Sequence, residues 1–302
     1  MPLPPAQLSI LASLDRPKEV GELAAANALP HRTAHQAVEV LEALGVVTSY
    51  RRGRERVVAV ASKALPALAR GLLVDTPRDD WDRVLHGNRP MQLHVLDRVG
   101  NAGLAAEVCG RARRTLYHTV ALLAPAGVLE KPGGRWRINP RLGTLRDYVA
   151  ELSRVEAHHG ASRIDPQATV AWHLGPEILL RSPNDLRGET VHLGGLSRFA
   201  EYGLDLVTGG STYYYVSTRP LDAADAILQG LLTDPESGVN RSYCALLYEI
   251  ARPSGVRRKA SIYGVEEEAA ALMHYVESHE ATGKFLPWRA HERYRRQYGV
   301  VG

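Results

Sequence analysis

The sequence lacks several common features, or has few of them, and these absences exclude certain classes of protein. It contains only two cysteines, Cys109 and Cys244, which excludes a disulfide framework and a zinc site made of cysteines alone, and which is typical of a reducing compartment. The most apolar stretch, residues 115–129, contains His118 and Pro125 and is shorter than the roughly 20 residues of a membrane span. The first residues also lack the basic start and the cleavage site of a signal peptide. We therefore expect a cytoplasmic protein without a membrane partner.

Signatures of catalysis are also missing. The chain contains no phosphate-binding loop, no nucleophile elbow and no HExxH pair. Its 12 histidines include His31 and His35, which share a predicted helix face with Glu39, and the adjacent pair His158 and His159. A metal site needs three or four ligands at a fixed geometry, so we interpret these histidines as exposed polar side chains. We expect a protein that is not an enzyme, with no catalytic residue, no metal and no cofactor.

Positive charge is present, and it is distributed unevenly. The length of 302 residues predicts two or three domains at about 150 residues each. Residues 1–152 hold 21 basic and 15 acidic side chains, whereas residues 153–302 hold 16 and 18. A GC-rich genome would explain why 32 of the 37 basic residues are arginine, but it does not explain why the excess lies in one half. Clustered basic charge favours a polyanionic partner.

An internal repeat organises the N-terminal half. When the chain is shifted by 82 residues, identical residues coincide in one register over about 36 positions. The coincident residues are Leu11 with Leu93, Leu14 with Leu96, Arg32-Thr33 with Arg114-Thr115, Val38 with Val120, Leu41 with Leu123, and Gly45-Val46 with Gly127-Val128. The shared register indicates two copies of one structural unit.

Each copy has the same predicted order of three helices and a β-hairpin. In the first copy we expect helices at residues 7–14, 21–26 and 31–44 and strands at residues 46–50 and 57–61. In the second copy we expect helices at residues 91–99, 104–109 and 111–124 and strands at residues 128–131 and 135–138. Pro30 suits the start of the third helix, and Gly45 suits its left-handed end. The predicted domains are residues 1–62 and 89–152, joined by a linker helix over residues 63–88 with a polar stretch at residues 76–80.

Both copies resemble a known family. Residues 29–35 with residues 41–47, and residues 114–116 with residues 123–129, resemble the recognition helix and the exit from it in winged helix-turn-helix regulators of the MarR/ArsR-like kind. The resemblance covers residues 6–62 and 89–140. It implies two winged helices that bind double-stranded DNA, although winged helices also serve as protein-interaction modules.

The residues of the third helix and the hairpin suit DNA in both copies. A helix-turn-helix places its second motif helix in the major groove, where Arg and Gln make bidentate contacts to purine edges. The candidate DNA-binding residues of the first copy are Arg32, Thr33, His35, Gln36, Arg51, Arg52, Arg54 and Arg56. Those of the second copy are Arg111, Arg113, Arg114, Tyr117, His118, Arg135 and Arg137. The alternative is that these residues form solvated helix faces and charged turns. Two units in one chain would take two half-sites about one helical turn apart, and a homodimer is also compatible with the sequence.

The C-terminal half is predicted to be a mixed α/β domain over residues 165–302. We expect a linker at residues 154–163, strands at residues 168–174 and 178–180, a helix at residues 191–202, a hairpin of residues 204–207 and 213–216, and helices at residues 221–232, 242–251, 266–277 and 288–298. For Tyr213, Tyr214 and Tyr215 we favour core and rim packing over a ligand or partner surface. Residues 257–259 favour a solvated turn over a phosphate contact. The predicted fold class is therefore α+β: two winged helix-turn-helix domains followed by this domain with a helical end.

The end of the chain resembles a second family. Residues 246–247, 260–265 and 285–288 are similar to the tails of abortive-infection type antitoxins, over about 60 residues. Those antitoxins pair a winged helix with a domain that opposes a nucleotidyltransferase toxin. The sequence thus supports two hypotheses. The first is a sequence-specific DNA-binding transcriptional regulator whose C-terminal domain serves a small effector, a partner protein or self-association. The alternative is an antitoxin or adaptor that binds a partner protein through that domain and autoregulates through its winged helices.

Overall fold

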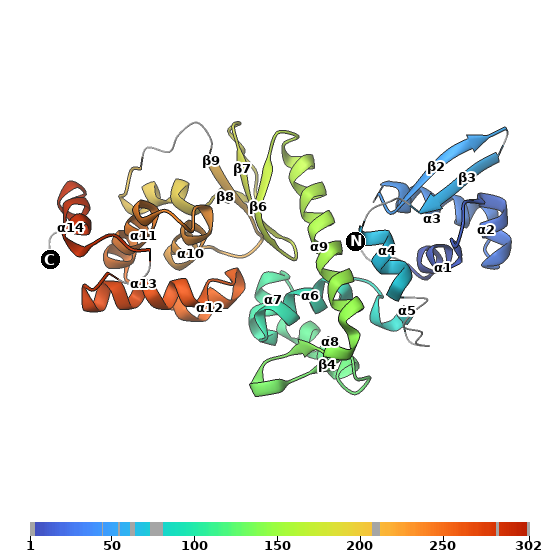
Figure 1. The fold of residues 1–302 in the computed structure, drawn as a ribbon, viewed down its shortest axis with the longest axis horizontal. Coiled ribbons are helices and arrows are strands. Elements are labelled where there is room, and N and C mark those ends of the chain that lie inside the picture. The colour runs from blue at the N-terminus through green and yellow to red at the C-terminus, as the bar shows by residue number, and fades with distance from the viewer. Residues whose placement is uncertain are drawn as a thin grey trace. The chain divides into compact units, whose positions relative to one another are not determined.

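The fold was obtained as a computed structural model, which describes residues 4–43, 45–53, 55–60, 64–72, 81–206, 212–281 and 284–300. Helices and small antiparallel sheets alternate along the chain, which confirms the predicted α+β class (Figure 1). Two compact units can be distinguished. The first unit comprises Met1–Asp97 and Leu116–Glu156, and the second comprises Arg98–Thr115 and Ala157–Gly302. Within the described ranges, no helix combines the length and the apolar character needed to cross a lipid bilayer.

The first unit begins with three helices and a three-stranded sheet. The elements in chain order are α1 (Pro5–Ser13), β1 (Lys18–Glu19), α2 (Val20–Ala26), α3 (His31–Ala43), β2 (Val47–Arg52) and β3 (Glu55–Val60). All five predicted elements are confirmed to within a few residues, and β1 is an addition. The sheet order is β1-β3-β2, and both pairings are antiparallel. Leu11, Leu23, Val38 and Leu41 are almost fully buried, because their spacing places them on the inner faces of amphipathic helices.

The second copy follows in the same chain order. Its elements are α6 (Arg89–Val99), α7 (Ala102–Val108), α8 (Arg113–Leu123), β4 (Leu129–Glu130) and β5 (Arg137–Ile138). The predicted elements are again confirmed, but the two strands are shorter than expected and form a two-stranded sheet only. Between the copies lie α4 (Ala64–Arg70) and α5 (Trp81–Val84), in the place of the predicted linker helix. The predicted polar stretch at residues 76–80 lies outside the described residues.

The third helices of the two copies, α3 and α8, end in the same way. Gly45 and Gly127 have φ angles of 66° and 71°, in the left-handed region that glycine adopts without a steric penalty. In each copy the valine after this glycine donates its backbone N–H to the carbonyl of the leucine five residues earlier, at 2.9 Å in the first copy and 3.0 Å in the second. This is the bond of a glycine-terminated helix. The repeat seen in the sequence is therefore also a repeat of backbone geometry.

The predicted linker at residues 154–163 is wrong. These residues belong to α9 (Gly143–Ile164), a continuous helix of 22 residues. His158, His159 and Gly160 made this segment look like a connection, but Ala157 and Ala161 are almost fully buried. They lie one helical turn apart, so they share a face, and this face packs on the sheet of the second unit. Small residues carry little hydrophobic signal in a sequence, although their size is what permits close packing.

A four-stranded antiparallel sheet forms the centre of the second unit. Its strands are β6 (Thr169–Leu174), β7 (Glu177–Ser182), β8 (Val191–Leu193) and β9 (Thr212–Val216), in the order β6-β7-β9-β8. Ile178, Leu180 and Tyr214 pack against the end of α9 on one face. Tyr214 and Tyr215 are both buried, which confirms the predicted core packing of the tyrosine run.

Two predictions for the middle of this unit are wrong. The helix expected at residues 191–202 is strand β8 followed by a 3-10 helix, η4 (Gly195–Tyr202). The reason is the pair Gly194 and Gly195. Gly194 has an extended backbone, with φ −126° and ψ 159°, and Gly195 has a φ of 52°, so neither continues an α-helix. A Cβ at Gly194 would lie 3.1 Å from backbone atoms of β9, so glycine permits this close approach. The hairpin expected between residues 204–207 and 213–216 is not formed by the described residues, because β9 pairs with β7 and β8. Its expected turn lies outside the described residues.

Five helices complete the second unit. They are α10 (Ala223–Thr233), α11 (Gly238–Ala251), α12 (Val256–Tyr263), α13 (Glu266–Ser278) and α14 (Trp288–Gln297). Four were predicted. The fifth, α12, was predicted as a solvated turn at residues 257–259, which is wrong because Lys259 is buried and helical. The helix is enclosed by Gly255 and Gly264, with φ angles of 92° and 69°, and its short length concealed its apolar face.

A buried glycine permits the close packing of α10. A Cβ at Gly230 would lie 2.8 Å from the Sγ of Cys244 on α11 and 3.2 Å from the ring of Phe199. We expect Gly230→Val to lower the free energy of unfolding by about 1–3 kcal/mol, because added atoms in a filled core force neighbouring groups to move. Urea unfolding followed by circular dichroism measures this change. Gly143→Ala is the control, since nothing lies within 4 Å of its added Cβ. An equal effect of both substitutions would mean that the close packing at Gly230 is not the cause of the destabilisation.

Candidate nucleic-acid interface

Helix α3 presents a polar face to solvent. Arg32 and Gln36 are exposed, Thr33 and His35 are half-buried, and all four lie away from the buried stripe of the helix. The His35 ring lies 4.7 Å from the ring of His31, so these two side chains limit each other's movement. Arg32 and Gln36 are one turn apart, which places their side chains side by side on the helix surface. The four predicted residues of this helix therefore form one continuous surface.

The β2–β3 hairpin adds basic residues to the same unit. Arg51 and Arg52 are both exposed near the end of β2. The guanidinium of Arg52 lies 2.7 Å from Glu19, in an ion pair whose arginine side chain is 70% exposed, so the arginine can exchange this partner for another anion at little cost. Arg54 lies outside the described residues. Arg51 and Arg52 are thus available to a polyanion.

Arg56 has a different environment from the other predicted arginines of the hairpin. It is half-buried, its Nε donates to the Oγ of Ser49 at 2.9 Å, and its guanidinium contacts the carboxylate of Glu42 on α3. Glu42 also accepts hydrogen bonds from the backbone N–H and hydroxyl of Ser49, at 3.0 and 2.7 Å. Arg56 therefore joins the hairpin to α3. Its sequence position beside three other arginines gave no sign of this contact.

The Glu42 carboxylate should make the first unit sensitive to acid. The hydrogen bonds from Ser49 and the nearby Arg56 hold the pKa of Glu42 below its ordinary value. A carboxylate with a lowered pKa stabilises the folded state above its ordinary pKa, and this stabilisation is lost as the pH falls through the lowered value. We therefore expect Glu42→Gln to be less stable than the original protein at pH 7, with a difference that shrinks below about pH 4.

Thermal unfolding of both proteins between pH 7 and pH 3 measures this difference. Glu55→Gln is the matched control, because Glu55 is exposed on the same hairpin. A destabilisation by Glu42→Gln that does not change with pH would mean that the charge of Glu42 has no part in it.

The second copy also exposes its predicted helix residues. Arg111, Arg113 and Arg114 are exposed at the start of α8, and Tyr117 and His118 are exposed one turn later. Tyr117 is 57% exposed, so its ring is accessible on the surface of the helix. All five residues therefore belong to the first turns of α8 or to the segment just before it.

Two of the predicted arginines of the second copy make contacts that the sequence did not reveal. Arg113 lies 3.4 Å from Glu107 on α7. Arg137 is half-buried and donates to the backbone carbonyls of Trp136, at 3.2 Å, and of Asp97 on α6, so it connects β5 to α6. Arg135 is exposed. The contact of Arg137 with α6 spans about 40 residues, and no local pattern indicates it.

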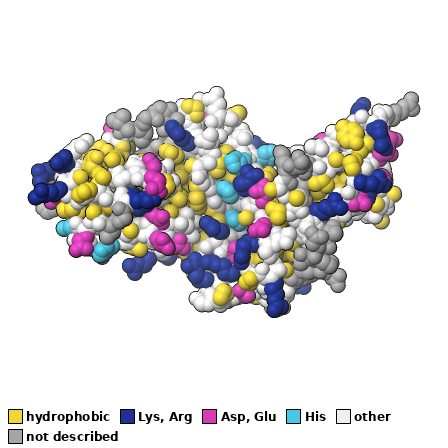
Figure 2. All heavy atoms as spheres, viewed as in Figure 1, with side chains coloured by type: hydrophobic (Ala, Val, Ile, Leu, Met, Phe, Trp, Pro, Cys, Tyr) yellow, Lys and Arg dark blue, Asp and Glu magenta, His cyan; other side chains and the backbone are white. Residues whose placement is uncertain are grey.

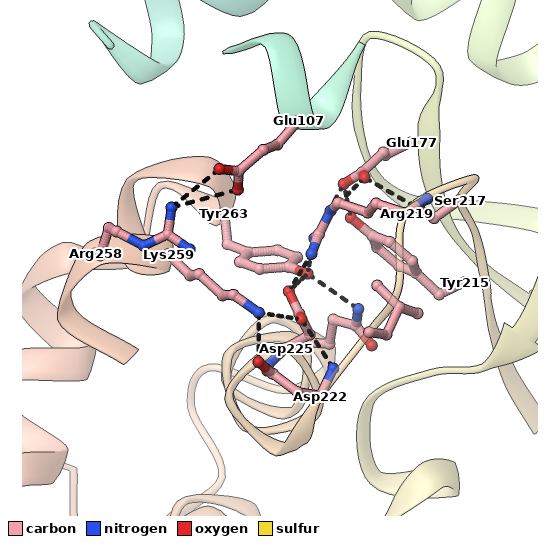
Figure 3. Close-up of polar contacts among 12 residues, drawn as sticks. Glu107, Glu177, Tyr215, Ser217, Arg219, Asp222, Asp225, Arg258, Lys259 and Tyr263 are labelled. Atoms are coloured by element: carbon pink, nitrogen blue, oxygen red, sulfur yellow. Dashed lines mark hydrogen bonds and ion pairs between the residues drawn. The ribbon is translucent and has the colours of Figure 1, made fainter. Parts of the chain in front are cut away.

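A network of buried charges lies within the second unit (Figure 3). The guanidinium of Arg219 is 2.6 Å from the carboxylate of Glu177 on β7, 2.8 Å from that of Asp225 on α10, and 2.8 Å from the hydroxyl of Tyr263 on α12. The ammonium of Lys259 lies 2.7 Å from a second oxygen of Asp225. The network therefore connects the sheet to two helices. Its members are dispersed over almost 90 residues, so no sequence motif reveals it.

The pKa values of the two buried carboxyls reflect these partners. Burial raises the pKa of Glu177, although Arg219 opposes this effect. Burial also acts on Asp225, but Arg219 and Lys259 outweigh it and bring its pKa to about 2. Asp225 is therefore an anion at neutral pH, and its two cations are held in place by it. This arrangement suits a structural framework.

A surface pocket of about 450 Å³ opens beside this network. Its charged lining residues are Glu107, Arg219, Asp222, Arg258 and Lys259. Each of the three cations is already paired with a carboxylate of the same unit. Within the described part of the chain, no group of three or more His, Cys, Asp or Glu side chains is arranged to hold a metal ion.

The comparisons with known proteins concern the end of the chain. Residues 188–300 match a family model described as "HVO_2833_C, C-terminal". The match begins just before β8 and includes α10 to α14, so it covers less than half of the chain and much of the second unit. No curated protein matches the sequence, and no solved structure does.

Proposed function

We propose that the protein is a sequence-specific DNA-binding transcriptional regulator without catalytic activity. It reads double-stranded DNA through two winged helix-turn-helix units, one in each copy of the repeat. The observation that carries this proposal is the exposed surface of α3, on which Arg32 and Gln36 stand side by side while the opposite face of the helix is buried. In a winged helix such a face enters the major groove.

The topology of the first unit supports the proposal. Three helices precede a hairpin, and the short strand β1 pairs with β3 to give the sheet order β1-β3-β2. The hairpin carries Arg51 and Arg52, which are exposed and in this proposal lie along the sugar-phosphate backbone. The recurrence of the helix end at Gly45 and Gly127 supports a second winged helix in the second copy of the repeat. Arg111, Arg113 and Arg114 would contact phosphates and guanine there.

The roles of the two sets of residues differ. Arg32 and Gln36 would read base edges, because both side chains form two parallel hydrogen bonds to purines. The arginines of the hairpin would position the protein without reading sequence. The C-terminal part of the second unit would serve a small effector, a partner protein or self-association.

DNA recovered with the protein from its own genome tests the proposal. We expect a small set of fragments that share a sequence, and a duplex with that sequence should bind more tightly than a shuffled duplex of equal length. The logarithm of the binding constant should fall linearly with the logarithm of salt concentration, with a slope of about −0.9 for each phosphate contact. Equal binding of both duplexes, or binding that does not change with salt, would reject the proposal.

A further inference from the structure

The last described helix, α14, carries a stripe of arginines on its outer face. Arg289, Arg293 and Arg296 are exposed and are spaced by four and three residues, so they lie in one row along the helix. The opposite face holds the helix in place: His291 is fully buried, and its Nε2 lies 2.7 Å from Glu249 on α11. Figure 2 shows basic side chains gathered where Figure 1 labels α14. We call Arg289, Arg293 and Arg296 the arginine stripe.

The arginine stripe carries an excess of positive charge over its surroundings on the helix. The neighbouring Arg295 pairs with Glu249 at 2.9 Å, but no hydrogen bond or ion pair joins any residue of the stripe to another described residue. Residues 284–300 contain five basic side chains and one carboxylate, Glu292, whereas residues 153–302 as a whole contain more acidic than basic side chains. The positive charge is thus concentrated on one helix of an otherwise slightly acidic half.

The stripe brings like charges together on the helix. Arg289, Arg293 and Arg296 repel one another at spacings of three and four residues, and Glu292, three residues from Arg289 and four from Arg296, offsets part of this repulsion. The helix dipole disfavours the positive charge of Arg289 in the first turn and favours that of Arg296 in the last turn. The stripe keeps a net positive charge, which an external anion would reduce.

We propose that the arginine stripe binds the phosphate backbone of double-stranded DNA without reading its sequence. This inference rests on the proposed function and adds a third contact region to it. Seven residues of α-helix span about 10 Å, which is the axial length of about three nucleotides of one strand at 3.4 Å each. The planar guanidinium group presents two parallel N–H donors to a phosphate, so one stripe fits a short run of phosphates.

Fluorescence anisotropy with the full-length protein tests the proposal. The probe is a labelled 30-base-pair duplex of random sequence, titrated at several salt concentrations. In the triple variant Arg289→Ala, Arg293→Ala, Arg296→Ala, we expect the salt-dependence slope to fall in magnitude by about 0.9 for each phosphate that is no longer bound. At 0.15 M salt the affinity should fall about fivefold if one arginine of the stripe binds a phosphate, and on the order of 100-fold if all three do.

The matched control removes three exposed arginines elsewhere in the second unit. Arg163, Arg181 and Arg257 are exposed on three different elements, so Arg163→Ala, Arg181→Ala, Arg257→Ala changes the net charge equally without removing a stripe. We expect a smaller change of slope in this variant. Equal changes in the two variants would mean that only net charge matters, and would overturn the proposal. The variant Arg289→Lys, Arg293→Lys, Arg296→Lys should keep most of the slope, which separates the removal of charge from misfolding.

The same titration distinguishes this inference from the proposed function. If the alanine variant of the stripe keeps the original slope while the protein still discriminates its genomic sequence from a shuffled duplex, the stripe proposal fails and the proposed function stands. If the slope falls but the protein never discriminates sequences, the stripe proposal stands and the proposed function fails. If the alanine variant keeps the original DNA affinity but binds poly-glutamate more weakly, the stripe serves an acidic protein. This result would also overturn the stripe proposal.

Discussion

Replacing Arg219 with methionine should lower the free energy of unfolding of the second unit by about 3–5 kcal/mol. Its guanidinium contacts Glu177 and Asp225, whose side chains are 2% and 0% exposed. Methionine fills a similar volume but leaves Glu177 without a counter-charge in a place that water does not reach. Removing one partner of a buried ion pair is costly for this reason, whereas removing an exposed pair is not.

Urea unfolding followed by circular dichroism and tryptophan fluorescence measures the effect of Arg219→Met. Arg187→Ala is the control, because Arg187 pairs with Asp185 and the two side chains are 88% and 67% exposed. We expect the control to change stability by less than about 0.5 kcal/mol. A change below about 1 kcal/mol for Arg219→Met would mean that water or movement compensates the buried carboxylates, and the network would not be a framework of the fold.

The second large effect concerns DNA. We expect Arg32→Ala to weaken binding to the genomic duplex by about 1–3 kcal/mol, which is about fivefold to 150-fold, because alanine cannot form the bidentate hydrogen bonds to a purine. Gln36→Ala should have an effect in the same range. Binding to a shuffled duplex should weaken less in both variants, since a contact to a base edge discriminates sequences and a contact to phosphate does not.

Gel-shift titrations of the genomic and the shuffled duplex with each variant measure these effects. Arg16→Ala is a suitable control, because Arg16 is exposed in the same unit and pairs with Glu22 at 2.5 Å but does not lie on α3. Equally weakened binding to both duplexes would mean that Arg32 contacts the sugar-phosphate backbone of DNA and not a base edge. Unchanged binding in both variants of α3 would remove this helix from the interface.

The N-terminal half could be predicted closely because its signals are local. The apolar residues of α3 recur at helical spacing, and a glycine follows at the point where the helix ends, so both the helix and its end are encoded within about 15 residues. The repeat adds a second, independent sign of the same unit. The exposed positions of Arg32, Gln36, Arg113 and Arg114 follow directly from that periodicity.

The C-terminal half was harder to predict because its elements depend on distant partners. Helix α12 has eight residues, which are too few for a clear periodicity. It is held against α10 by Lys259 and Tyr263, which are buried and both bond to Asp225. The end of α9 contains small residues whose burial depends on a strand that follows in the sequence. Residues 191–193 form a strand, rather than the expected helix, because they pair with β9.

The sequence by itself determined the repeated unit, the places where its helices begin and end, and the exposed arginines, because helix periodicity and glycine ends act over one or two turns. Only the tertiary structure decided which charges have partners. Arg56 joins Glu42, Arg137 reaches α6, and Arg219 holds two buried carboxylates. Such contacts form wherever folding brings the groups within a few ångströms, and residues 6 to 42 positions apart carry no local mark of that meeting.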